Sequence, residues 1–381
     1  MSEIKVNSIK GVGASTAAIT VNNSDGTCTA NLTNRTNKNL IINGAMTIAQ
    51  RGSSSTASDY GAVDRFRVRN SNTDEAAFTQ SQVTDSPDGF GNSLEIDITT
   101  AESAIASDEL FIIRTILEAN SLQSLAFGTS SANQITLSFY VKAYQTGTYV
   151  LNLYSDDSAR SYTANYTINQ SATWERKTIT FAGDTVGTIT NDNGAGLYLN
   201  WFLAAGTNYT SSTAHKNQWA SFVTQSWAHG QTVNVLSSTD NYWKLTGVQL
   251  EVSDHATDFE HENTSDTLLK CQRYFQVFKT ADAVAGNTTG LNFTATMFCT
   301  MRATPSAGKI NYQGNATFNF GDMVSVADTS TNTPTFDSYI NQEITITGAI
   351  AGFDNLTAYR SYKHEPTTTN SALISADAEL N

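Results

Sequence analysis

The sequence contains few prolines, few cysteines and few charged residues. Of its 381 residues, 4 are proline, 3 are cysteine and 15% are charged, whereas typical globular proteins have about 25% charged residues. The cysteines, Cys28, Cys271 and Cys299, lie far apart and outside any CxxC spacing. We therefore expect neither a disulfide framework nor a zinc site, and we expect no cofactor.

Long apolar runs and basic clusters are also missing. No stretch approaches the 18 apolar residues of a membrane-spanning helix, and the opening MSEIKVNSIK lacks the apolar region of a signal peptide. The chain has 22 basic and 35 acidic residues, a net charge of −13. Nucleic acid is bound by basic clusters. We therefore expect no nucleic-acid partner, no membrane insertion, and synthesis in a cytoplasm.

Ser, Thr and Asn make up about a third of the chain, and aromatic residues a further 10%. Thr and aromatic residues favour strands, while Asn, Ser and Gly favour turns. Helical bundles instead require Leu, Ala, Glu and Lys. The composition therefore predicts an all-β protein.

Alternating apolar and polar residues predict a large β-sandwich over residues 40–262. The clearest alternation is in TLSFYVKA, TYVLNLYSDD and RKTITFAGD. Further strands are expected at 64–70, 75–83, 92–100, 110–117, 197–205 and 242–252. Eight or more strands with long excursions favour a jelly-roll-like sandwich. We expect Trp174, Trp201 and Trp243 in its core.

Residues 1–39 contain no aromatic residue and cannot form a core of their own. Short alternations of Ile and Val suggest that identical copies bury these side chains between them. The alternative is an unstructured tail. The residues predicted to associate are Ile4, Val6, Ile9, Ile19 and Val21.

The rest of the chain divides into a junction and a smaller domain. DTLLKCQRYFQVF, residues 266–278, is the one place where a short helix is expected, so 263–278 is predicted to be a helical junction. Residues 279–381 return to short strands and predict a C-terminal β-rich distal domain.

Several segments, in order, carry a resemblance to a known family. They are NLIINGAMTIAQRG (39–52), DRFRV (64–68), AFTQSQVTDSPDGFGNSLEI (77–96), YWKLTGVQLEVSDHATDFEH (242–261) and LLKCQRYFQVF (268–278). Together they resemble the tail-fibre and related virion-fibre proteins of marine bacteriophages, over about residues 40–280. The chain departs from the pattern at Ser253, Asp254 and His255, in place of a glycine-containing turn, and at Glu262, in place of a basic residue.

The resemblance implies a homotrimeric appendage of a virion. Its N-terminal segment would attach to other virion proteins, such as a tail or portal-proximal adaptor, and its C-terminal regions would meet the host surface. The implied function is that of a tail fibre that binds a host glycan or protein. A head fibre or capsid decoration without a receptor role is one alternative, and a polysaccharide depolymerase tailspike is another.

Motifs for catalysis are not evident. There is no GxSxG elbow and no GxxxxGKS phosphate loop, and the five histidines form no HxH or HxxH spacing. Glycoside hydrolysis would require two converging carboxylates, for which Asp156, Asp157, Asp184 and Asp192 are the cluster to inspect. We predict a protein that is not an enzyme and holds no metal.

The aromatic-rich tract 201–230 is the best candidate for a binding site. In it Tyr209, Trp219, Trp227 and His229 lie among Ser, Thr, Asn and Gln residues. An aromatic ring beside amide and hydroxyl groups can stack on a sugar ring and bond its hydroxyls. We predict these four residues as glycan or receptor contacts. The alternative is that the rings fill a loop on the sandwich or a subunit interface.

Overall fold

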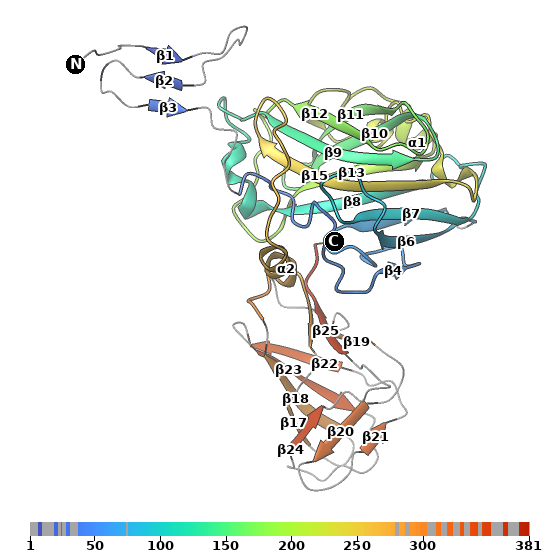
Figure 1. Ribbon diagram of the computed structural model, residues 1–381, viewed down its shortest axis with the longest axis vertical. Coiled ribbons are helices and arrows are strands. Elements are labelled where there is room, and N and C mark those ends of the chain that lie inside the picture. The colour runs from blue at the N-terminus through green and yellow to red at the C-terminus, as the bar shows by residue number, and fades with distance from the viewer. Residues whose placement is uncertain are drawn as a thin grey trace.

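A computed structural model shows a protein that is nearly all β. It describes residues 7–9, 19–21, 24, 28–30, 37–73, 75–278, 282–285, 290–296, 298–302, 310–313, 318–322, 328–330, 336–341, 345–351, 361–364 and 373–380. Figure 1 shows a two-layered sandwich, with further strands below it and three short strands to one side. Within the described residues, no helix has the length and apolar character needed to cross a membrane.

Two six-stranded antiparallel sheets form the sandwich. Sheet I has the strand order β14 (Ala220–Ser221), β11 (Arg160–Ile168), β10 (Gly147–Ser155), β13 (Ala195–Ala205), β8 (Leu110–Glu118) and β5 (Arg67–Ser71). Sheet II has the order β12 (Glu175–Phe181), β9 (Ile135–Ala143), β15 (Tyr242–Val252), β7 (Ser93–Thr100), β6 (Ala77–Val83) and β4 (Ser54–Ser55). From β7 to β13 the chain crosses between the sheets repeatedly, so the predicted all-β, jelly-roll-like sandwich is confirmed.

Strict alternation along the strands separates the core from the outer face of sheet I. In β13, Leu199 and Trp201 enter the central hydrophobic core, while Asn200 between them faces outward. Trp201 and Trp243 are fully buried, as predicted. The prediction that Trp174 lies in the core is wrong. It is half-buried, and its Nε1 donates to Asp85 Oδ1 at 3.2 Å on the outside of sheet II.

Helical turns are short and occur between strands. They are η1 (Ala119–Leu125), α1 (Thr207–Thr210), η2 (Thr224–Ser226) and η3 (Val235–Ser237). The longest α-helix described is α2 (Thr264–Gln272), whose first turn is capped by the Asn263 side chain, which accepts from Ser265 N at 3.1 Å. This helix lies within the segment where the sequence predicts one.

Three smaller sheets flank the sandwich in sequence. Residues before it form β1 (Ser8–Ile9), β2 (Ile19–Val21) and β3 (Cys28–Ala30), which pair in that order. A three-stranded sheet has the order β16 (Phe275–Phe278), β25 (Leu373–Asp377) and β19 (Ile310–Gln313). A seven-stranded sheet has the order β21 (Asp328–Ser330), β20 (Phe318–Asp322), β24 (Ser361–His364), β17 (Asp282–Ala285), β18 (Gly290–Thr296), β23 (Thr345–Ala351) and β22 (Phe336–Asn341). The predicted domain boundaries remain a prediction.

Two arginines connect the sandwich to the segment after α2. The Arg51 guanidinium lies 3.7 Å from the centre of the Phe275 ring, and that of Arg65 lies 3.4 Å from the centre of the Tyr274 ring. Arg65 adopts φ +71°, in a region that non-glycine residues seldom occupy. Three of the five segments that carry the sequence resemblance, 39–52, 64–68 and 268–278, thus meet at this junction.

Residues 377–380 return to the same junction. The Glu379 carboxylate pairs with the buried Arg65 guanidinium, and Arg51 pairs with Asp377 at 3.1 Å. Tyr60 Oη donates to Leu380 O at 2.8 Å. Strands β16 and β25 lie side by side as the chain leaves the sandwich and comes back to it (Figure 1).

Candidate functional site

A row of polar residues crosses the outer face of sheet I at matched register. Three of them lie within strands that are otherwise largely apolar, LFIIRTILE, GTYVLNLYS and AGLYLNWFLAA. Antiparallel pairing places them opposite one another across four neighbouring strand pairs. The row is Arg67, Arg114, Asn200, Asn152 and Thr163.

The two buried asparagines in this row connect a guanidinium to an indole. Arg114 Nε donates to Asn200 Oδ1 at 2.6 Å, and Asn200 Nδ2 donates to Asn152 Oδ1 at 3.2 Å. Asn152 Oδ1 also accepts from Trp227 Nε1 at 3.0 Å. An indole N–H and a guanidinium can only donate, so they fix which way each amide points. The network therefore holds Arg114 and Trp227 in place before any ligand arrives.

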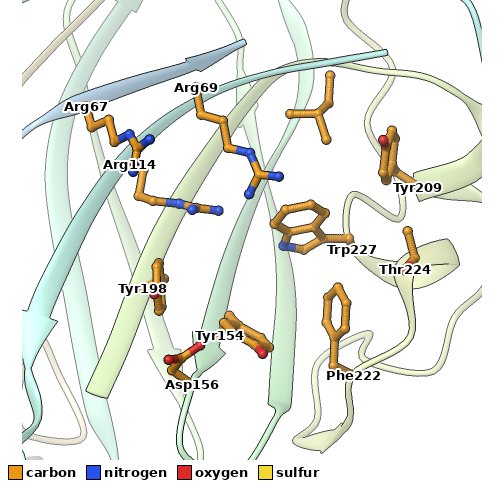
Figure 2. A pocket seen from close by; sticks show the side chains of 11 residues that line it. Arg67, Arg69, Arg114, Tyr154, Asp156, Tyr198, Tyr209, Phe222, Thr224 and Trp227 are labelled. Carbon is orange, nitrogen blue, oxygen red and sulfur yellow. The ribbon is translucent and has the colours of Figure 1, made fainter. Parts of the chain in front are cut away.

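A cavity of about 650 Å³ lies above this row, within the ~300–1,000 Å³ range of ligand sites. Figure 2 shows arginine side chains on one side of it, aromatic side chains on another, and one carboxylate away from the arginines. It is lined by Arg67, Arg69, Leu110, Arg114, Tyr154, Asp156, Tyr198, Tyr209, Phe222, Thr224 and Trp227.

The aromatic wall comes from the long excursion between β13 and β15. Trp227 is 8% exposed and packs edge-on against Phe202 and Phe222, with ring centres 5.5 and 5.6 Å apart. Tyr209, on α1, packs against the same indole at 6.0 Å. The excursion is tied to itself by Ala228 N, which donates to Tyr209 O at 2.8 Å. These contacts give a defined wall rather than a loose loop.

Three arginines form the cationic side. Arg67 pairs with Asp59 at 3.0 Å, and Arg69 lies over the Trp227 ring, 5.3 Å from its centre. Burial, followed by the charge of Arg69, lowers the pKa of Arg114 to about 9. Burial and the charge of Arg67 likewise lower the pKa of Arg69. Among the described residues, no carboxylate lies within ion-pair distance of Arg69 or Arg114.

Asp156 is the one carboxylate that lines the cavity. Burial raises its pKa, and the neighbouring Asp157 raises it further, while Arg114 acts in the opposite direction. Asp156 is thus a hydrogen-bond acceptor on the side of the cavity away from the arginines (Figure 2).

The four predicted glycan contacts do not all come together. Tyr209 and Trp227 line the cavity. Trp219 lies elsewhere, packed edge-on against Phe127 with ring centres 5.5 Å apart. His229 is not among the lining residues, and its Nδ1 lies 3.2 Å from Thr210 O. Any contact of these residues with a glycan stays a prediction.

The carboxylates considered for hydrolysis have separate local roles. Asp184 pairs with Arg160 at 2.7 Å, Asp157 accepts from Thr190 N at 3.0 Å, and Asp192 accepts from Gly194 N at 2.7 Å. Of the four, Asp156 alone lines the cavity. In the described part of the chain, no group of three or more His, Cys, Asp or Glu side chains could hold a metal ion.

The residues predicted to associate between copies are only partly described. Ile4 and Val6 lie outside the described residues. Ile9 is 53% exposed on β1, and Ile19 and Val21 are half-buried on β2. Burial of these three side chains between chains stays a prediction.

The sequence analysis did not predict the arginines that line the cavity or the asparagines that are bonded to Arg114 and Trp227. A single polar residue in the middle of an apolar strand is the signal that Arg114, Asn152 and Asn200 share. Arg67 and Arg69 alternate with the buried Val68 on β5, which marks the outward face. The sequence does not show that these positions lie side by side, because that depends on how the strands pair.

Comparisons with known proteins give structural neighbours of low similarity. No family profile and no curated protein match the sequence. The enzymatically active domain of tailspike protein 4 of bacteriophage CBA120 is 11% identical, with a TM-score of 0.30, over 57% of this chain and 22% of that one. A family 11 carbohydrate-binding module of a cellulase from Clostridium thermocellum is 13% identical, with a TM-score of 0.27, over 55% of this chain and 98% of the module. A xylan-binding domain from Paenibacillus barcinonensis is 9% identical, with a TM-score of 0.24, over 53% and 94%.

The chain thus spans about a fifth of the length of the tailspike domain and nearly the whole length of the two carbohydrate-binding modules. Similarity of this degree does not establish a shared family or function. The function of the chain is therefore inferred from the residues that line its own cavity.

Proposed function

We propose that the cavity on the outer face of sheet I, here called the cleft, binds a saccharide. The proposal is carried by the cavity, in which aromatic rings lie beside hydrogen-bond donors that neighbouring residues already hold in place. Tyr209 and Phe222 offer ring faces or edges for a sugar, and Trp227 supports them. Arg114 is held by Asn200, so a ligand need not order it on binding.

The cleft supports binding of a saccharide without cleavage. Most glycosidases use two carboxylates, about 5–9.5 Å apart, on either side of the scissile bond. The lining of this cavity offers Asp156 and no second carboxylate. We therefore propose a binding protein, with the depolymerase tailspike as the alternative that an assay for new reducing ends would detect.

We further propose that the chain serves as a tail fibre of a bacteriophage, attached to the virion through its N-terminal segment and to the host through saccharides. The sequence resemblance supports this assignment. Three copies around one axis would bring three cleft sites together, and weak sites joined in this way gain retention by avidity. A head fibre or capsid decoration is the alternative, which immunolabelling of particles distinguishes. A monomer in light scattering would contradict the trimer.

The first test is substitution of Tyr209, which lies at the side of the cavity and keeps its ring half-exposed. Purified chain is screened on neutral and acidic oligosaccharides, and the best binder is titrated calorimetrically. We expect Tyr209→Ala to weaken binding at least tenfold, because the ring that stacks on the sugar is lost. Tyr144, 47% exposed and outside the cavity, supplies the control Tyr144→Ala. Binding unchanged in Tyr209→Ala, or no binding of any oligosaccharide, would contradict the proposal.

A further inference from the structure

We propose that the saccharide bound in the cleft is anionic and carries its carboxylate or sulfate group against Arg69 and Arg114. This inference rests on the proposed function, because it concerns the ligand of the same cleft. It adds the chemical class of that ligand.

The charge in the cleft is opposite in sign to that of the molecule. The chain carries −13 overall, yet three arginines and one aspartate line this cavity. Arg67 has its own partner in Asp59. Arg69 and Arg114 are left as cations that face a space with a single acidic neighbour, Asp156. The arginines would therefore attract an anion that enters the cleft, although the negatively charged molecule as a whole repels it.

Four other buried or half-buried arginines each pair with a carboxylate, while the half-buried Arg302 donates to the backbone oxygens of Ala378 and Asn193. Arg51 pairs with Asp377, Arg65 with Glu379, Arg160 with Asp184 and Arg273 with Glu118. Arg114 is 6% exposed, and its Nε donates to the neutral amide of Asn200. Burying a guanidinium without a counterion is unfavourable. A binding role explains why this cation lacks the carboxylate that each of the other four has.

The geometry gives the ligand a direction. Figure 2 shows the guanidinium groups of Arg69 and Arg114 directed toward the same space beside Trp227, with Asp156 on the other side of the cavity. Guanidinium groups bind carboxylate and sulfate oxygens through paired N–H donors. Asp156 would repel that anion and accept from ring hydroxyl groups instead. Tyr209 and Phe222, on the aromatic side, provide the surface that a free inorganic anion would not use.

The test compares matched ligands on the full chain by calorimetry. The probes are an oligogalacturonate, its methyl ester, a sulfated neutral oligosaccharide, its unsulfated parent, and inorganic sulfate. We expect the two acidic oligosaccharides to bind at least tenfold more tightly than their neutral partners, and inorganic sulfate to bind more weakly than either. Raising the salt concentration should weaken binding of the acidic ligands alone.

Two substitutions test the arginines separately. Arg69→Gln, on the edge strand β5, and Arg114→Gln should each lower the ratio of acidic-ligand to neutral-ligand affinity at least tenfold. Arg176→Gln is the control, since Arg176 lies on sheet II and donates to Thr257 O. Because Arg69 lies over the Trp227 ring on the edge strand β5, outside the buried amide network, Arg69→Gln also covers the case in which Arg114→Gln fails to fold.

The outcomes separate this inference from the proposed function. Equal binding of acidic and neutral oligosaccharides, with Tyr209→Ala still weakening both, would overturn the anionic ligand and leave saccharide binding in place. Inorganic sulfate binding as tightly as the sulfated oligosaccharide would overturn the role given to the aromatic wall. Absence of binding to every oligosaccharide would overturn both proposals.

Discussion

At the scale of single residues, the cleft depends on two asparagines that no solvent reaches. Asn152 and Asn200 are both 0% exposed, and they lie in strands whose other outward residues are largely apolar or aromatic. A buried amide is costly unless its hydrogen bonds are made. Here they are made to Arg114, Trp227 and Thr163, so the two amides position Arg114 and Trp227, which line the cavity.

We expect Asn152→Leu to destabilise the protein and to weaken ligand binding together. The substitution leaves Trp227 Nε1 and Asn200 Nδ2 without their shared acceptor, a loss of about 1–3 kcal/mol in the free energy of unfolding. Denaturant unfolding and calorimetric titration measure the two effects. Thr167→Ala, at an exposed position on β11, is the control and should change stability by less than about 0.5 kcal/mol. Stability reduced with binding intact would show that Asn152 supports the fold but not the cleft.

At the scale of the elements, sheet II places two lysines side by side; Asp85 bonds both of them, and Glu95 pairs with Lys244 at 2.8 Å. Lys142 on β9 and Lys244 on β15 are directly opposite in the register, and like charges so placed repel. Asp85 accepts from Lys142 at 2.9 Å and from Lys244 at 2.7 Å. Partial burial alone would raise the pKa of Asp85. The hydrogen bonds from Lys244, Lys142 and Trp174 outweigh it and lower the pKa to about 2.

The stabilisation from Asp85 should therefore depend on pH. A carboxyl whose pKa is lowered on folding stabilises the protein above its unfolded pKa of about 3.9, and this contribution is lost as the pH falls toward 2. We expect Asp85→Asn to lower the free energy of unfolding by about 0.5–1 kcal/mol at pH 7, a small value because the side chain is 38% exposed. The difference from the unsubstituted protein should shrink as the pH falls through 2 and vanish below it. Asp88→Asn, at an exposed position in the same loop, should show no such convergence.

The elements were largely predictable from sequence, and the cleft was not. The strands predicted at 197–205 and 242–252 are observed as Ala195–Ala205 and Tyr242–Val252, because runs rich in apolar and aromatic residues indicate buried strands. Tyr209 and Trp227 were found because aromatic residues are conspicuous in a polar loop. Arg114 and Asn200 are 86 residues apart and meet only through strand pairing. A register of this kind is decided by the packing of the whole sandwich, and a single sequence does not display it.

At the scale of the whole molecule, one ion pair joins residues from distant parts of the chain. Arg65 and Glu379 are separated by 314 positions, and both side chains are nearly fully buried. Arg65 Nη2 also donates to Ile116 O at 2.5 Å, which places the guanidinium at the edge of sheet I. The segment before the predicted distal domain and the last residues of that predicted domain are thus both held to the sandwich at this junction.

We expect Glu379→Gln to be among the most destabilising single substitutions in the chain. It leaves the Arg65 guanidinium buried without its carboxylate, and breaking a buried pair in this way costs about 3–5 kcal/mol. Arg51 keeps Asp377 and should moderate the loss. Denaturant unfolding is the measurement, with the exposed Asp240→Asn as control. A change below about 1 kcal/mol would mean that the pair contributes little to stability.

The pair between Arg65 and Glu379 also sets an order of events during synthesis. Ribosomes add about 5–20 residues per second, so the 314 positions between the two residues correspond to roughly 15–60 s. Throughout that interval Arg65 is without its partner, and the last strand of the sandwich, β15, is itself made only partway through it. The sandwich therefore reaches its final stability only after residue 379 has left the ribosome.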